Sequence, residues 1–266
     1  MNRPLVDSHC HLDYLARNGG DLAGVLARAR NAGVGTMLTI GTKLREFDIV
    51  RGIAEANDDV VCSVGIHPHE AGNELTDAAQ LVDLARHPKV VGIGETGLDY
   101  FYDKSPRPQQ QANFRTHLAA AAQSGLPVIV HTRDADDDTA AMLSAAAGQG
   151  RLTGVLHCFT SSLALARHAL DLGLYISVSG IVTFKNADEL RDTVRQIPLE
   201  RLLVETDSPF LAPVPVRGKA CEPAFVVHTA ARLAEIKGVS AEVLATATTR
   251  NFFTLFSRSK PGTEAA

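Results

Sequence analysis

Apolar residues recur along the chain in short runs, separated by longer segments of amphipathic character. The runs read as strands and comprise residues 4–10, 33–41, 60–68, 90–97, 127–132, 153–159, 173–180 and 201–207. Helical periodicity is clearest in residues 21–33, 109–125 and 161–173. The last two segments end in Gly125 and Gly173, and glycine commonly terminates a helix. The pattern therefore predicts strands that alternate with helices.

This alternation repeats eight times without an interrupting linker, short repeat or low-complexity segment. Each helical crossover returns the chain to a neighbouring parallel strand. The order predicts an α/β protein with the fold of a (β/α)8 TIM barrel, as a single domain over residues 1–256. Residues 257–266, SRSKPGTEAA, read as a disordered C-terminal tail.

Composition and charge narrow the class of protein. Hydrophobic residues make up 45% of the chain and charged residues 21%, which is ordinary globular composition. The formal charge of −4 means that a polyanionic partner would be met by a local basic patch or by bound cations. No apolar run approaches a membrane span, and the N-terminus has no apolar signal region. The four cysteines form no CxxC pair, so we expect a reduced, cytoplasmic protein without a membrane partner.

Polar residues gather where the predicted strands end. In a parallel barrel these carboxyl ends open onto one mouth, which is where barrel enzymes place their sites. The residues are His9, His11, His67, His69, Glu95, His131, His157 and Asp207. Strict alternation would place Asp7, His9 and His11 on one face of the first strand and Cys10 on the other. The remaining histidines lie in helical contexts and read as surface or capping residues: His87, His117, His168 and His228.

Imidazoles and carboxylates together predict a metal site at this mouth. Such ligands suit Zn²⁺, Mn²⁺, Ni²⁺ or Mg²⁺, and the histidine content favours the borderline-soft ions. One catalytic ion takes about three protein ligands, so this set is large enough for two ions. A carboxylate bridges two cations through its two oxygens, and Glu95 on the fourth strand is the natural bridge.

The ordered motifs resemble those of the TatD-family metal-dependent deoxyribonucleases, which are amidohydrolase-type barrels. The matching segments are DSHCHLD, GIHPH, GIGETGLDY, HTRDA, LHCFTSS, SGIVTFKNA and LLVETDSPFLAP, followed by RGK and EP. The resemblance implies one ion held by His9, His11, Glu95 and Asp207, and a second held by Glu95, His131 and His157. It also implies a hydrolase of phosphoesters whose substrate is DNA, cut by an exonuclease action.

The resemblance and the chemistry together suggest roles for individual residues. Paired cations polarise a phosphoryl oxygen and activate water. Asp207 is the expected general base, and Glu95 is the bridging catalytic carboxylate. Glu205 reads as buried support for the site. Cys10 and Cys158 flank ligand histidines, but strand alternation turns both away and predicts buried, inert thiols.

Substrate contacts are less sharply marked. Residues that can bind a phosphate are His67, Arg133, Lys185, Arg217 and Lys219, each of which also reads as a solvated loop residue. The aromatic run from Tyr100 to Tyr102 suits stacking on a base or packing on the barrel rim. Ala220 and Cys221 stand where family members usually carry a basic residue and an asparagine, which weakens the predicted grip on nucleic acid there.

Two other functions fit the same residues. Paired ions also polarise a carbonyl, so a metal-dependent amide or ester hydrolase, acting for example on aminoacyl esters or cyclic amides, is the alternative enzyme. Carbonyl hydrolases of this barrel type often bridge their ions with a carboxylated lysine, whereas this chain offers Glu95. A non-catalytic metal-bound scaffold would have no need of Asp207 beside an open metal position. The sequence does not set the oligomeric state, and a monomer is compatible with it.

Overall fold

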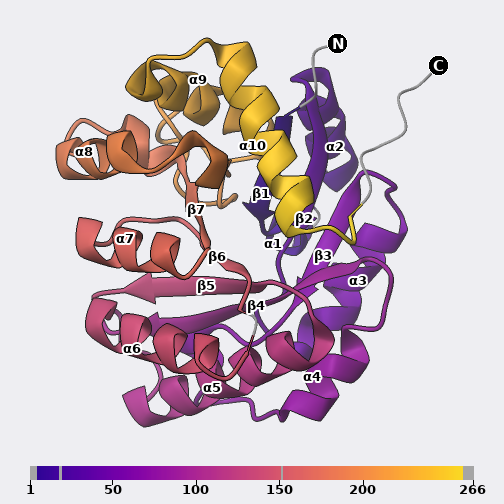
Figure 1. Cartoon of the computed structure of the whole chain (residues 1–266). Helices are drawn as coiled ribbons and strands as arrows, with labels where there is room; N and C mark the ends of the chain where they lie inside the picture. The colour runs from indigo at the N-terminus through magenta and orange to yellow at the C-terminus, as the bar shows by residue number, and fades with distance from the viewer. Residues whose placement is uncertain (1–4, 18–19, 151, 260–266) are drawn as a thin grey trace.

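The structure, a computed structural model, describes residues 5–17, 20–150 and 152–259. Eight parallel strands follow one another in chain order around a barrel (Figure 1). They are β1 (Leu5–Cys10), β2 (Val34–Thr39), β3 (Val60–Val64), β4 (Val90–Asp99), β5 (Val128–Arg133), β6 (Gly154–Leu156), β7 (Tyr175–Val178) and β8 (Leu202–Val204). The predicted (β/α)8 barrel is therefore confirmed.

Helices surround the strands (Figure 1). They are α1 (Leu12–Ala16), α2 (Leu22–Asn31), α3 (Phe47–Glu55), α4 (Ala78–Leu84), α5 (Arg107–Ser124), α6 (Asp136–Ala147), α7 (Leu163–Asp171), α8 (Asp188–Gln196), α9 (Val226–Lys237) and α10 (Ala241–Leu255). Helix α5 begins with Pro108 in its first turn and ends at Gly125, whose φ of +68° suits glycine. Its buried Phe114 belongs to the core between strands and helices.

The interior of the barrel is apolar at the end opposite the predicted site. Each strand contributes one buried residue to a second cluster, namely Val6, Leu38, Val61, Val91, Ile129, Val155, Tyr175 and Leu203. Phe252 and Phe256, in and just after α10, complete this cluster. Burial of such side chains contributes about 25 cal/mol per Å² of apolar surface. The residues predicted for the site do not belong to this apolar cluster.

The first and last strands meet at a seam that closes the barrel. The Asp207 N–H donates to the His9 carbonyl at 2.9 Å, and the His11 N–H donates to the Ser208 carbonyl at 2.8 Å. A parallel bridge joins Cys10 to Ser208. Strands β6 and β8 are shorter than predicted because the chain leaves the ladder before His157 and Asp207.

The chain remains ordered into the start of the predicted tail. The Arg258 guanidinium donates to the carbonyls of Ala85 and Val90 at 2.6 and 3.2 Å, and Ser259 is buried. Residues 260–266 of the predicted tail lie outside the described residues. Within the described part of the chain, no helix combines the length and apolar character needed to cross a membrane.

Candidate metal centre

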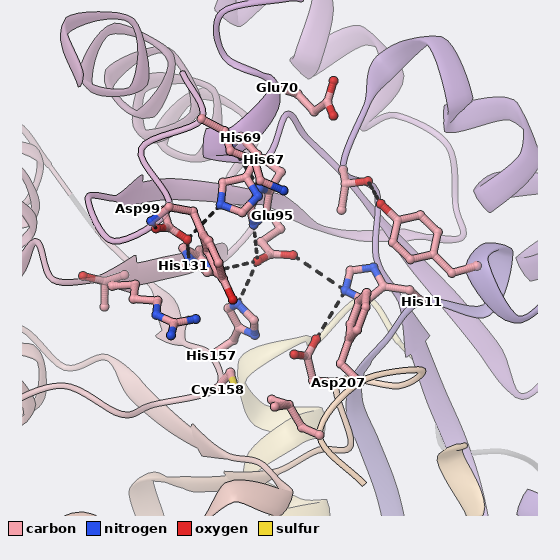
Figure 2. Close-up of a pocket in the computed structure, with 18 of the residues that line it drawn as sticks. His11, His67, His69, Glu70, Glu95, Asp99, His131, His157, Cys158 and Asp207 are labelled. Atoms are coloured by element: carbon pink, nitrogen blue, oxygen red, sulfur yellow. Dashed lines mark hydrogen bonds and ion pairs between the residues drawn. The ribbon is translucent and has the colours of Figure 1, made fainter. Parts of the chain in front are cut away.

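The residues predicted as metal ligands meet at the mouth of the barrel, and Figure 2 labels all of them except His9. Each comes from a strand or from the residues just after one: His9, His11, Glu95, His131, His157 and Asp207. His9 is fully buried, and the others line a cleft of about 1110 Å³. Five separate strands thus converge on one group of ligand atoms.

Glu95 divides this group into two halves, one on each carboxylate oxygen (Figure 2). Its Oε2 lies 3.4 Å from His9 Nε2 and 3.9 Å from His11 Nε2. Asp207 Oδ1 lies 3.3 Å from His11 Nε2 and 3.7 Å from His9 Nε2. We call His9, His11 and Asp207 the A half of the site.

The other oxygen of Glu95 faces three further histidines. Oε1 lies 2.8 Å from His157 Nε2, 3.1 Å from His131 Nδ1 and 3.3 Å from His67 Nε2. We call His67, His131 and His157 the B half. His67, predicted as a phosphate-binding residue, therefore lies at ligand distance from the bridge. Glu95 therefore contacts both halves, one through each carboxylate oxygen.

The unsatisfied atoms of the site fit a bound metal. Both ring nitrogens of His9 and Nδ1 of His11 are buried, and none has a hydrogen-bond partner among the described residues. A buried polar atom without a partner costs roughly 1–3 kcal/mol. The ligand atoms fall into three groups, and the atoms of each group lie within 4.8 Å of one another. A cation at His9 Nε2 would satisfy that nitrogen, so the residues present fit a divalent ion.

Electrostatics favour positive charge at this position. Burial lowers the pKa of His9 and lowers that of His67 to about 4, so both rings are neutral and able to act as ligands at neutral pH. Burial opposes ionisation of Glu95, but the charge of His157 and the hydrogen bonds from His131 and His157 hold the pKa of its carboxyl well below the usual range. Burial alone would lower the pKa of His157, yet Glu95 and Glu205 raise it. The same negative field favours a metal cation.

The A half is held by the seam and by Asp7. The Asp7 carboxylate accepts hydrogen bonds from the Thr206 N–H at 2.9 Å and the Thr206 hydroxyl at 2.6 Å. Burial raises the pKa of Asp7 to about 8. Asp207 has a φ of +58°, a left-handed conformation that costs roughly 1–2 kcal/mol in a residue other than glycine. The contacts of Thr206 with Asp7, and of Asp207 with His9, hold this segment in place.

The register of β1 corrects the expected alternation. From Asp7 to Cys10 the strand advances three residues, while the paired segment of β2 advances two, from Met37 to Thr39. This irregularity is a bulge, which re-aims side chains. Asp7 therefore bonds to the segment after β8 instead of joining the two histidines. The Cys10 thiol is buried and donates to the Leu38 carbonyl at 3.4 Å, as its predicted inert role requires.

Cys158 differs from its prediction. It has a φ of +43°, is only partly buried and lines the cleft, so strand alternation does not describe it. Its thiol lies 3.2 Å from the Ser179 hydroxyl. Burial, followed by the charges of Asp207 and Glu205, raises the pKa of this thiol well above its ordinary value. An un-ionised thiol is a poor nucleophile, so the predicted inertness is retained.

The B half is held by buried carboxylates behind its histidines. Asp99 Oδ2 lies 2.8 Å from His69 Nε2 and 3.1 Å from His131 Nε2. Glu205 Oε1 lies 3.3 Å from His157 Nδ1 and accepts the Cys158 N–H at 2.8 Å. A carboxylate on the far nitrogen of a ligand histidine orients the ring and raises its basicity. Glu205 thus supports the site as predicted, whereas the sequence argument overlooked the role of Asp99.

A buried polar stripe on α5 positions the backbone of the B half. Gln110 accepts the Asp99 N–H at 2.8 Å and donates to the Asp99 carbonyl at 3.2 Å. His117 accepts the Ile66 N–H at 2.9 Å, and Asn113 donates to the Ile66 carbonyl at 2.8 Å. Ile66 immediately precedes a site histidine. His117 is completely buried, so its interpretation as a surface or capping residue was wrong.

The sequence contained a signal for this stripe. Gln110, Asn113 and His117 are spaced three and four residues apart, which places polar groups on one helix face next to the apolar Phe114. Gly97 shows a similar local demand: its φ is +136°, and a Cβ there would lie 2.0 Å from the His131 carbonyl oxygen. Because any other residue at position 97 would place its Cβ against this carbonyl oxygen, only glycine allows β4 to approach β5 so closely.

Of the predicted phosphate contacts outside the ligand group, Arg133 lines the cleft. Its guanidinium carbon lies 4.0 Å from the Phe101 ring centre and 4.8 Å from that of Tyr102, and no described residue forms an ion pair with it. The described lining of the cleft does not include Lys185, Arg217 or Lys219, so their roles stay predictions. Lining residues that the sequence argument did not single out include Tyr14, Thr42, Lys43, Lys104 and Phe210.

Comparison with known proteins agrees with this arrangement. Residues 6–257 match the family described as TatD related DNase. An uncharacterized metal-dependent hydrolase of Escherichia coli K12, YcfH, is 48% identical over 257 residues that cover 95% of each chain. The 3'-5' ssDNA/RNA exonuclease TatD of Klebsiella pneumoniae is 39% identical over 239 residues, covering 87% of this chain and 90% of its own.

A solved structure gives the same picture. The crystal structure of YjjV, a TatD homologue from Escherichia coli, superposes with a TM-score of 0.87 at 32% identity, covering 97% of this chain and 99% of its own. Together with the barrel and its mouth, these likenesses define a metal-dependent hydrolase. The chain belongs to the TatD related DNase family.

Proposed function

We propose that the protein is a two-metal phosphodiesterase that cuts DNA as an exonuclease. The observation that carries this proposal is the placement of Glu95, whose two oxygens face two separate groups of ligands. His9, His11 and Asp207 would share one divalent ion with Glu95, and His131 and His157 the other. Bound cations would supply Lewis acidity towards a phosphoryl oxygen and towards water.

The chain's own residues supply the remaining chemistry. Burial opposes ionisation of Asp207, but the hydrogen bond to His11 and the charges of His11 and His157 hold the pKa of its carboxyl below the ordinary value. An ionised Asp207 at the cleft surface is able to accept a proton from the attacking water. Arg133, stacked on two aromatic rings and without an ion-pair partner among the described residues, suits a non-scissile phosphate oxygen.

Two observations favour DNA over a carbonyl substrate. The bridging position holds Glu95 instead of a carboxylated lysine, and a relative with 39% identity is named a 3'-5' ssDNA/RNA exonuclease. The four cysteines are all unpaired, which suits the reduced cytoplasmic compartment where we place the protein. The ion is Zn²⁺, Mn²⁺, Ni²⁺ or Mg²⁺.

Metal-stripped protein incubated with end-labelled oligonucleotides tests the proposal. Single- and double-stranded substrates receive each of the four ions separately, and labels at the 5′ and 3′ ends distinguish exonuclease from endonuclease products. We expect stepwise shortening with at least one ion and none without metal. Asp207→Asn, which keeps the volume of the side chain, should lower kcat by roughly 10³-fold while the protein still binds metal.

Other outcomes assign the site differently. Hydrolysis of aminoacyl esters or cyclic amides, with no cleavage of any oligonucleotide, would make the protein a carbonyl hydrolase. Metal binding without hydrolysis of either substrate class would make it a scaffold.

A further inference from the structure

Exposed aromatic side chains gather beside the metal centre. The described chain exposes seven large hydrophobic side chains, and three of these are aromatic: Phe101, Tyr102 and Phe210, which are 54%, 52% and 49% exposed. Tyr102 and Phe210 line the cleft, and Phe101 packs against the cleft residue Arg133. The four exposed aliphatic side chains do not line the cleft: Ile49, Leu75, Val214 and Val243. Exposure of aromatic rings is therefore specific to this mouth.

One group of rings adjoins the A half. Tyr14 stacks on His11, with ring centres 5.1 Å apart and an angle of 18° between the planes. Phe210 stands edge-on to both, at 6.1 Å from His11 and 6.2 Å from Tyr14. The Phe210 N–H donates to the Asp207 carbonyl at 3.0 Å, which ties this ring to the proposed base. We call Tyr14 and Phe210 the A ledge.

A second group adjoins the B half. The Tyr102 ring stands perpendicular to His69, with centres 5.5 Å apart. Phe101 and Tyr102 pack edge to face at 4.9 Å, and the Arg133 guanidinium lies over both rings. We call Phe101, Tyr102 and Arg133 the B ledge. The guanidinium plane of Arg133 and the two rings present flat surfaces beside His69, which contacts Asp99.

We propose that the two ledges are nucleobase-stacking subsites, one on each side of the scissile phosphate. This inference rests on the proposed function, which places that phosphate at Glu95 between the two halves. A base 5′ of the phosphate and a base 3′ of it then reach opposite ledges. Aromatic rings and guanidinium planes are the surfaces on which proteins stack unpaired bases. Both bases must leave a helical stack, so the substrate is the single-stranded end of a nucleic acid.

The exposed aromatic rings of the ledges are unfavourable in water unless a ligand covers them. Side chains that serve only to pack the rim would be buried by it, yet about half of each of the three rings is open to solvent. Cationic side chains lie over rings of both ledges: Arg17 lies over Tyr14 of the A ledge, and Arg133 and Lys104 lie over rings of the B ledge. Arg17 is paired with Asp13 and Glu46, whereas Arg133 has no ion-pair partner among the described residues. Replacing an aromatic residue on which a base stacks with alanine lowers the affinity by about 5- to 150-fold per base.

Abasic oligonucleotides test the proposal with the wild-type protein. One tetrahydrofuran residue replaces the nucleotide on the 5′ or the 3′ side of the scissile phosphate, whose position the end-labelling experiment maps. We expect each replacement to raise KM by about 5- to 150-fold, with a smaller change in kcat. Equal KM values for intact and abasic strands would overturn the inference, and this arm does not depend on the folding of any variant.

Variants assign each ledge to one side. Phe210→Ala should raise KM for the intact strand. In this variant, the abasic replacement on one side of the scissile phosphate should cause no further increase in KM. In Tyr102→Ala, the abasic replacement on the opposite side should cause no further increase. Phe210→Leu and Tyr102→Leu keep an apolar side chain without a ring and should behave as the alanine variants do. Val243→Ala, at a residue 48% exposed near the start of α10, is the matched control and should leave KM unchanged.

The outcomes separate this inference from the function on which it rests. If wild-type protein cuts no oligonucleotide, the proposed function fails. If it cuts, but the variants affect intact and abasic strands equally, the ledges only shape the rim and the stacking inference fails.

Discussion

The two halves of the metal centre are supported in different ways. The A half depends mainly on backbone bonds across the seam, where His9 and His11 pair with the segment carrying Asp207, and the Asp7 side chain adds bonds to Thr206. The B half depends on side chains, because Asp99 and Glu205 orient its histidines and the polar stripe of α5 bonds to the backbone of Asp99 and of Ile66, which precedes His67. Backbone pairing survives most substitutions, whereas a side-chain network does not. Point mutations should therefore weaken the B half more selectively than the A half.

The largest expected effect joins the two halves. Glu95→Gln keeps the shape of the side chain but removes its charge. Both halves of the site would then lose the anionic metal ligand that they share. We expect kcat to fall by roughly 10³-fold or more and metal content to drop below that of the wild type. Elemental analysis of dialysed protein, together with steady-state kinetics, measures both. Unchanged metal content and activity would remove Glu95 from its proposed role.

The second prediction separates the halves. Asp99→Asn keeps a hydrogen-bonding group but removes the negative charge behind His131, so affinity for one of two ions should fall by about 10- to 100-fold. Competition with a chromogenic chelator resolves the two binding steps. Glu95 remains in this variant, and the A half should bind its ion with wild-type affinity. Equal weakening of both steps would show that the halves do not act separately.

The third prediction concerns the stripe of α5. Gln110→Leu leaves the N–H of Asp99 and the carbonyl of Ser105 without their buried partner, which should lower the free energy of unfolding by about 2 kcal/mol. Urea denaturation of metal-free protein measures this change. Thr116→Leu, on the exposed side of the same helix, is the control and should have little effect. Equal stability of the two variants would contradict the positioning role.

The smallest expected effect is a pH dependence from His117. Burial lowers its pKa to about 4 in the folded protein, while the unfolded chain binds a proton below about 6.5. Stability from this group is therefore complete above pH 6.5 and is lost as the pH falls towards 4. Between about pH 7.5 and 5.5 the loss is about 1 kcal/mol.

The control for that prediction removes the titrating ring but retains an acceptor for the Ile66 N–H. Metal-free His117→Gln should lose less stability than the wild type across the same pH interval, as measured by urea denaturation. Parallel pH profiles would show that His117 does not titrate in this way.

Sequence patterns were most reliable where chemistry follows the barrel's repeat. Alternation of strands and helices predicted the fold, and polar residues at strand ends led to the ligand group around Glu95. The failures were local. A bulge redirected Asp7, a left-handed backbone turned Cys158 towards the cleft, and His117 looked like a helix-surface residue because nothing in its own helix reveals a partner in the loop after β3.

Loop residues were the hardest to place. Lys185, Arg217 and Lys219 were chosen for charge alone, and charge does not determine how far a loop residue lies from a cleft. Asp99 was overlooked because its importance depends on contacts with His69, in the turn after β3, and with His131, on β5. Such contacts follow from strand register and helix packing, which a single sequence does not specify.

The seam also determines when the A half of the site can assemble in a chain that is still being synthesised. His9 and Asp207 share one half of the site, so a ribosome must add about two hundred residues after the first before the second exists. At ordinary rates of synthesis this interval is roughly 10 to 40 s. Truncated and nascent polypeptides that end before Asp207 contain His9 and His11 but lack the aspartate of the A half, so this half cannot assemble until the chain after β8 has been made.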